Sequence, residues 1–119
     1  VIVYTELDRF THRPVRFGDP LFNPGDTLAT EISQLLTLYH EGSGDLQAWH
    51  QPRATVVTTS RRERKECFLV NQITLPANLS VGNYRLKVLT RDEVSGAEAE
   101  AFLPISVVAD ARLAQEPGR

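Results

Sequence analysis

Apolar and polar side chains alternate with a period of two between residues 84 and 108, and this pattern constrains the fold more than any other. Tyr84–Arg91 and Ala97–Val108 both show the alternation, and the turn-forming residues 92–96 (DEVSG) separate them. A period of two places successive side chains on opposite faces of a β-strand. The two segments therefore predict a β-hairpin with one face in a core and the other in solvent.

The alternation also assigns the faces of this hairpin. The predicted core face carries Tyr84, Leu86 and Val88 on the first strand, and Ala99, Ala101, Leu103, Ile105 and Val107 on the second. The solvent face carries charged residues, among them Arg85, Lys87, Glu98 and Glu100, which predict cross-strand ion pairs. Pro104 has no N–H to donate, so it indicates that the last strand lies at a sheet edge or contains a bulge.

Five further segments are rich in β-branched and aromatic residues, which predicts strands. They are Val1–Leu7, Ser33–His40, Leu46–Gln51, Ala54–Thr59 and Cys67–Leu75. Pro52 and Pro76 are expected to end two of them, because proline interrupts a strand ladder. The glycine-containing segment Glu41–Asp45 suits a hairpin turn, and the proline- and glycine-rich segment His12–Gly25 predicts a long loop.

Residues 26–40 fit two periods. Leu28, Ile32, Leu35, Leu36 and Tyr39 lie at helical spacing, and Asp26 suits the cap of a helix. Thr30, Ile32, Gln34, Leu36 and Leu38 also share one face of a strand. We expect a strand over at least Ser33–His40, with a short helix over Asp26–Ile32 as the open alternative.

The totals exclude several classes of protein. A length of 119 residues suits one domain, and the single cysteine, Cys67, rules out an intrachain disulfide. The net charge of −2 gives no general attraction to nucleic acid, and no run of about 18 apolar residues could span a bilayer. We therefore predict an all-β, two-sheet sandwich of about seven strands over residues 1–108, followed by a tail or linker over residues 109–119.

The segment LPANLSVGNYRLKV, residues 75–88, resembles the E–F corner and the following strand of immunoglobulin-like domains found in bacterial multidomain proteins. The wider pattern, with VYTELDRF, LYHEGSGDLQAW and RRERKECFLV, resembles an uncharacterised bacterial family of such domains. This resemblance implies an immunoglobulin-like sandwich and brings no known activity. It also implies that Tyr84 is a structural corner residue whose hydroxyl binds the backbone of the preceding turn.

The run RRERK contains the main candidate binding residues, Arg61, Arg62, Arg64 and Lys65. Four positive charges in five residues suit an anionic partner such as a polysaccharide or an acidic protein face. Glu63 and Glu66 partly neutralise the run, and no aromatic residues interleave with it as single-stranded nucleic acid would require. The alternative is a solvated loop that discourages edge-to-edge strand pairing.

The remaining reactive side chains form no catalytic pattern. Cys67 has basic neighbours that would lower its pKa, but no base or oxyanion hole accompanies it, so a buried packing role is expected. His40 and His50 flank the predicted hairpin, and His12 lies in the long loop, without the three or four convergent ligands that a metal needs. We expect no catalytic residue, no metal and no cofactor.

These observations favour a non-catalytic structural or protein-interaction module of a larger bacterial protein, outside the cytoplasm in the periplasm or at the cell surface. Its expected partners are another protein or neighbouring domains of the same chain, with no nucleic acid and no direct membrane insertion. One alternative is a ligand-binding domain that uses Arg61–Lys65 or the loop His12–Gly25. Another is a hydrolase accessory domain or a small enzyme that uses Cys67 or the histidines, and a cytoplasmic location is the alternative to export.

Overall fold

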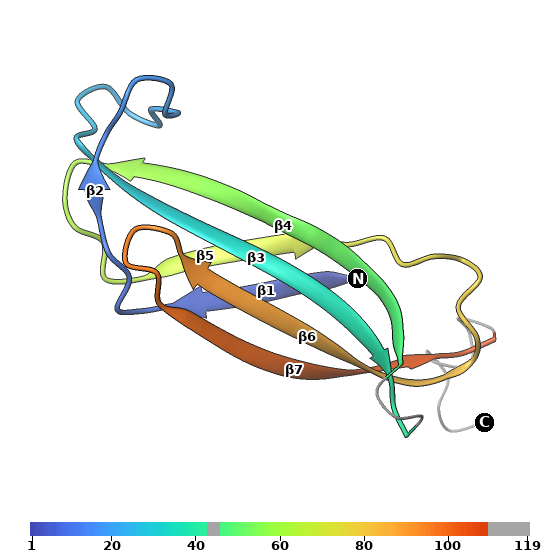
Figure 1. Cartoon of the computed structure of the whole chain (residues 1–119). Helices are drawn as coiled ribbons and strands as arrows, with labels where there is room; N and C mark the ends of the chain where they lie inside the picture. Colours follow the sequence, from blue (N-terminus) through green and yellow to red (C-terminus); the bar gives the residue numbers. More distant parts are fainter. Residues whose placement is uncertain (43–45, 110–119) are drawn as a thin grey trace.

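The computed structural model describes residues 1–42 and 46–109, and the strands within these ranges form two antiparallel sheets (Figure 1). The strands are β1 (Ile2–Leu7), β2 (Arg13–Pro14), β3 (Leu28–His40), β4 (Gln47–Ser60), β5 (Cys67–Gln72), β6 (Gly82–Asp92) and β7 (Glu98–Val107). The predicted all-β, two-sheet sandwich of about seven strands is confirmed. The short helix considered over Asp26–Ile32 is wrong, because residues 28–32 belong to the first half of β3.

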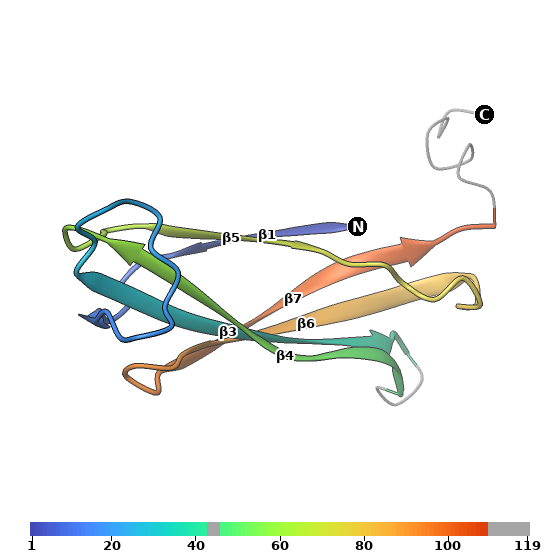
Figure 2. The same ribbon diagram turned by 90° about the horizontal axis from the view of Figure 1, so that it is seen from above.

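The two sheets differ in width. β1 and β5 form the small sheet, and β4, β3, β6 and β7 lie side by side in the large sheet, where β2 pairs with the start of β3. In Figure 2 the small sheet lies on one side of the large sheet, so the molecule has two layers. Most of the predicted tail, residues 110–119, and the centre of the predicted hairpin turn, residues 43–45, lie outside the described residues.

The core lies between the small sheet and the two central strands of the large sheet. β3 and β6 contribute Leu36, Leu38, Tyr84, Leu86 and Val88, which pack against Val3 and Ile73. Ile32, Cys67 and Leu69 form a second cluster nearer the other end. Trp49 is partly buried against the first cluster, as expected for a residue that helps to cover the sheet.

β4 continues through Pro52, where the sequence predicted that a strand would stop. Its pairing with β3 shifts between the pairs Gln34–Ala54 and Leu36–Gln51, so Pro52 and Arg53 lie in a bulge. Within the described residues β4 pairs only with β3 and is therefore an edge strand. A bulge on an edge strand accommodates a residue that cannot donate a ladder hydrogen bond, which explains why proline does not end the strand here.

A polar cluster connects the two layers. The side-chain amide of Gln34 on β3 is buried and donates to the hydroxyls of Thr5 on β1, at 3.0 Å, and Thr90 on β6, at 3.1 Å. The side-chain amide of Asn71 on β5 donates to Oε1 of the Gln34 side chain. Because buried polar groups require partners, this cluster fixes the position of the small sheet over the large one.

The inner face of β7 is more exposed than its alternation predicted. Ala99, Ala101 and Leu103 pair with inward-facing residues of β6, yet all three are exposed, and Leu103 retains 40% of its accessible surface. Only Ile105 and Val107 on this face are partly buried against the core. The cause is the width of the small sheet, because its two strands cannot cover all five strands of the large sheet.

Candidate functional site

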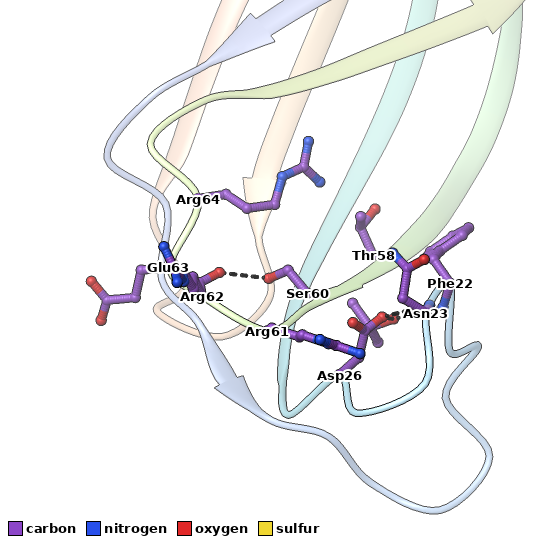
Figure 3. A pocket seen from close by; sticks show the side chains of 10 residues that line it. Phe22, Asn23, Asp26, Thr58, Ser60, Arg61, Arg62, Glu63 and Arg64 are labelled. Carbon is purple, nitrogen blue, oxygen red and sulfur yellow. Dashed lines mark hydrogen bonds between the residues drawn. The ribbon is translucent and has the colours of Figure 1, made fainter.

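The predicted basic residues lie in the loop between β4 and β5, at one end of the sandwich (Figure 1), and Figure 3 shows Arg61, Arg62 and Arg64 from close by. This loop and the end of the long loop form an open cleft of about 580 Å³, which we call the arginine cleft. Its lining comprises Phe22, Asn23, Asp26, Thr58, Thr59, Ser60, Arg61, Arg62, Glu63 and Arg64. The structure thus brings three of the four candidate cations to one cleft, and Lys65 lies outside its lining.

Arg61 connects the two loops that form the arginine cleft. Its Nε donates to the carbonyl oxygen of Pro24 at 3.0 Å, and its Nη2 donates to the same oxygen. The side chain lies against Gly25, where an added Cβ would be 3.3 Å from the guanidinium. Gly25 also has a φ of +89°, which favours glycine. The charge of Arg61 is therefore partly used to hold the loops together.

Asp26 forms the buried wall of the arginine cleft. Its Oδ2 accepts hydrogen bonds from the hydroxyl of Thr59, at 2.8 Å, and from the backbone N–H of Asn23, at 3.1 Å. These contacts attach the turn of residues 23–26 to the end of β4. Asp26 therefore has a structural role here, instead of the helix cap considered from the sequence.

Arg62 and Arg64 make backbone hydrogen bonds to their surroundings. The backbone N–H of Arg64 donates to Nε2 of His12 at 3.0 Å, which places His12 against this loop. The backbone carbonyl of Arg62 accepts from the hydroxyl of Ser60 at 2.8 Å, and the side chain of Arg62 is exposed. The cleft therefore offers the charges of Arg62 and Arg64 to a ligand more freely than that of Arg61.

The long loop is held by an ion-pair network. The guanidinium of Arg13 bonds to Asp19 at 2.8 Å and to Glu31 at 2.8 Å, and Arg16 reaches Glu31 at 2.9 Å. The hydrogen bond from Arg13, followed by that from the backbone of Arg16, holds the pKa of Asp19 well below its usual range. The carboxylates of Asp19 in the loop and Glu31 on β3 are therefore both paired with arginines of the loop.

Cys67 and the histidines lie apart from one another. Cys67 is 2% exposed, and burial raises the pKa of its thiol while Arg64 opposes that effect only in part. The ring of His40 packs on that of Tyr84 at 4.6 Å, and His50 lies near Gln47. Within residues 1–42 and 46–109, no group of three or more histidine, cysteine or acidic side chains is placed to hold a metal ion.

Tyr84 has the corner geometry that the resemblance implied. Its ring is fully buried, and its hydroxyl donates to the backbone carbonyl of Ser80 at 2.6 Å. The hydroxyl of Ser80 lies 3.0 Å from the hydroxyl of Tyr84. The tyrosine thereby fixes the turn that leads into β6.

A second cleft, which the sequence did not predict, lies between β1 and β7. This strand cleft has a volume of about 270 Å³. Its lining comprises Val3, Tyr4, Thr5, Glu6, Leu7, Val88, Thr90, Ala99, Glu100, Ala101 and Leu103. Two lining residues are carboxylates and none is a cation. Ala99 and Ala101, at consecutive inward positions of β7, are exposed. The sequence did not show this, because it does not reveal that the small sheet contains only β1 and β5 among the described residues.

We compared the chain with protein-family models, with curated proteins and with solved structures, and found no match in any of the three. The described residues contain no helix that is long and apolar enough to cross a membrane. Function must therefore be argued from the two clefts and the sheet edges themselves.

Proposed function

We propose that this chain is a non-catalytic, immunoglobulin-like module of a larger bacterial protein, located outside the cytoplasm, and that it makes contacts with other proteins. The observation that carries this proposal is the mismatch in sheet width. Within the part of the chain that the structure describes, the inner face of β7 and one edge of β1 stay uncovered beside the strand cleft. Uncovered apolar surface of this kind is a feature of protein interaction sites.

Two further observations support a contact role. Phe17, Leu21 and Phe22 are exposed on the long loop, and Phe17 is fully exposed. Exposed aromatic side chains supply a large part of the energy of protein interfaces. The chain therefore offers apolar contact surface both along the strand cleft and at one end of the sandwich.

Site-specific photocrosslinking in cells that produce the protein tests this proposal. A photoreactive phenylalanine analogue at Ala101 faces the strand cleft, and the same analogue at Ser106 provides a control on the opposite face of β7. We expect a crosslinked protein adduct from position 101 and little from position 106. Equal adduct formation from both positions, or none from either, would contradict a contact at the inner face.

The second candidate function is the binding of an anionic ligand in the arginine cleft. The observation that favours it is the convergence of Arg61, Arg62 and Arg64 on one open cleft. Guanidinium groups bind sulfate and carboxylate oxygens in bidentate geometry, so a sulfated or acidic polysaccharide has suitable chemistry.

A heparin hexasaccharide is the probe for this second function, with Kd measured by calorimetry at several salt concentrations. Arg62→Gln removes a cleft charge, and Lys65→Gln removes the same charge from a residue outside the cleft lining. A specific site predicts that Arg62→Gln weakens binding about tenfold, while Lys65→Gln changes it about twofold or less. Equal effects of the two variants would indicate unspecific attraction.

A further inference from the structure

The geometry points to strand addition in the strand cleft: an extended segment of another polypeptide pairs with the free edge of β1 and covers the inner face of β7. This inference rests on the proposed role as an interaction module and names the form of its partner. The partner segment has apolar side chains on one face and basic side chains on the other.

The backbone of β1 is the first support. The N–H of Ile73 donates to the carbonyl of Val1 at 2.8 Å, and the amino group of Val1 donates to the carbonyl of Ile73 at 3.2 Å. In an antiparallel pair such mutually bonded residues alternate with residues whose backbone groups point the other way. The continuous register of β1 therefore directs the backbone groups of Ile2, Tyr4 and Glu6 to the free edge.

The dimensions of the strand cleft are the second support. It extends beside residues 3–7 of β1 and 99–103 of β7, which is five residues on each strand. Five residues of a strand span about 17 Å, and a neighbouring strand lies about 4.8 Å from β1. One added strand would place two or three side chains over Ala99 and Ala101, whose small side chains leave room for valine, isoleucine or leucine.

The distribution of proline is the third support. The two outer strands of the large sheet each contain one, Pro52 in the bulge of β4 and Pro104 in β7. The N–H of Asp92 donates to the carbonyl of Ala97, and bonded pairs alternate with non-bonded pairs along β6 and β7. The pair of Arg85 with Pro104 is a non-bonded one, so the backbone nitrogen of Pro104 faces the free edge of β7. Proline and bulges protect edges against strand pairing, and β1 contains neither.

Charge selects the partner. Glu6 and Glu100 are the carboxylates in the lining of the strand cleft, and Lys87 already lies 3.4 Å from Glu100, so Glu6 on β1 is the one available to a partner. The β1 strand of a second copy contains Glu6 and no cation, so pairing of β1 with itself would gain no favourable charge pair at this edge. A segment with lysine or arginine on its outer face instead gains a favourable pair with Glu6, so the occupant is a basic strand of a different polypeptide.

The test measures binding of the probe peptide Lys-Val-Lys-Val-Lys-Val-Lys to the full chain by calorimetry and by amide NMR shifts. The control peptide has the same composition in the order Lys-Lys-Val-Val-Val-Lys-Lys, which breaks the alternation. We expect saturable binding of the first peptide, with shifts concentrated in β1 and β7, and at least about tenfold weaker binding of the control. Equal binding of both peptides would contradict strand addition.

A pair of proline variants identifies the edge. Tyr4 and Val70 are directly paired across β1 and β5, and their backbone N–H groups point to opposite free edges of the small sheet. Tyr4→Pro removes a donor from the proposed edge, and Val70→Pro removes the matched donor from the other edge. We expect Tyr4→Pro to weaken peptide binding about tenfold and Val70→Pro to change it less than about twofold.

A second pair of variants serves if the proline variants fold poorly. Ala101→Phe fills the strand cleft at an already exposed position and should abolish binding, whereas Ser106→Phe adds the same bulk on the opposite face of β7 and should not. Binding that survives Ala101→Phe, or that is lost only with Val70→Pro, would overturn the inference. Concentration-dependent dimerisation in sedimentation that Tyr4→Pro abolishes would replace it with self-association.

The outcomes separate the two levels of the argument. Photocrosslinks at position 101 together with unchanged peptide binding in Tyr4→Pro would keep the interaction module and reject strand addition. If no crosslinks form but the alternating peptide still binds more tightly than the control peptide, β1 is able to accept a strand but does not do so in the cell.

Discussion

Substitution of Tyr84 by phenylalanine tests the corner that fixes the entry to β6. The change removes one hydroxyl and keeps the ring, which is fully buried between the layers. The lost contact is the hydrogen bond to the carbonyl of Ser80 at 2.6 Å. Ser80 is exposed, so its carbonyl can bind water once the hydroxyl is gone, and the cost stays near the usual net value of one hydrogen bond.

We therefore expect Tyr84→Phe to lower the free energy of unfolding by about 1 kcal/mol. Tyr84→Ala also removes the ring and leaves a cavity, so its expected cost is about 3–5 kcal/mol. Urea unfolding, followed by the fluorescence of Trp49, measures both values. A loss of 1 kcal/mol lowers the urea midpoint by about 0.5–1 M and Tm by about 4 °C.

Tyr39→Phe is the matched control, because the hydroxyl of Tyr39 makes no hydrogen bond to the described residues. It should change the urea midpoint by no more than about 0.2 M, since the half-buried side chain keeps its ring and loses no hydrogen bond. If Tyr84→Phe unfolds at the same urea concentration as the parent, the hydroxyl does not stabilise the corner and this reasoning is refuted.

Three further predictions concern the buried side chains of Gln34, Asp92 and Cys67. Gln34→Leu removes the cluster between the layers and should cost about 2–3 kcal/mol in urea unfolding, with faster amide exchange in β1 and β5 than in β6; equal or greater stability would show that the cluster contributes nothing net. Burial acts to raise the pKa of Asp92, but N–H donors from Thr11 and Val94 outweigh it and lower the pKa overall. Its stabilisation is therefore present above the unfolded-state pKa, near pH 4, and is lost as the pH falls below it, so Asp92→Asn should weaken the acid dependence of unfolding below about pH 4. Cys67 should react with a thiol reagent at pH 8 at least about 100-fold more slowly in the native chain than in urea, because burial raises its pKa; a native rate near the urea rate would contradict this.

The faces of the strands were predictable because they depend on local alternation alone. The inward set Thr30, Ile32, Gln34, Leu36 and Leu38 is found on β3, and the period of two proved decisive over the helical one. Two-residue periodicity requires only that one side of a strand be covered, and neighbouring residues carry that information. The corner at Tyr84 was likewise visible, because its partner lies four residues away.

Features set by distant contacts were not predictable. Pro52 indicated a strand end, because the sequence does not show that the residue lies in a bulge on an edge strand. Ala99 and Ala101 were assigned to a core that the small sheet does not reach. The basic run was visible, but the contact of Arg61 with Pro24, 37 residues earlier, depends on how two loops meet.

β1 pairs with β5, a strand that is distant from it in the sequence. Val1 bonds to Ile73, a residue 72 positions further along, and the pairing of β1 with β5 has no local turn to nucleate it. Closing so long a loop carries an entropic cost that the hairpins of β3 with β4 and β6 with β7 avoid. The expected folding sequence is thus an early four-stranded layer with a bare apolar face, followed by capture of the first strand in the rate-limiting step. During that interval the nascent chain is most exposed to aggregation and most dependent on chaperones.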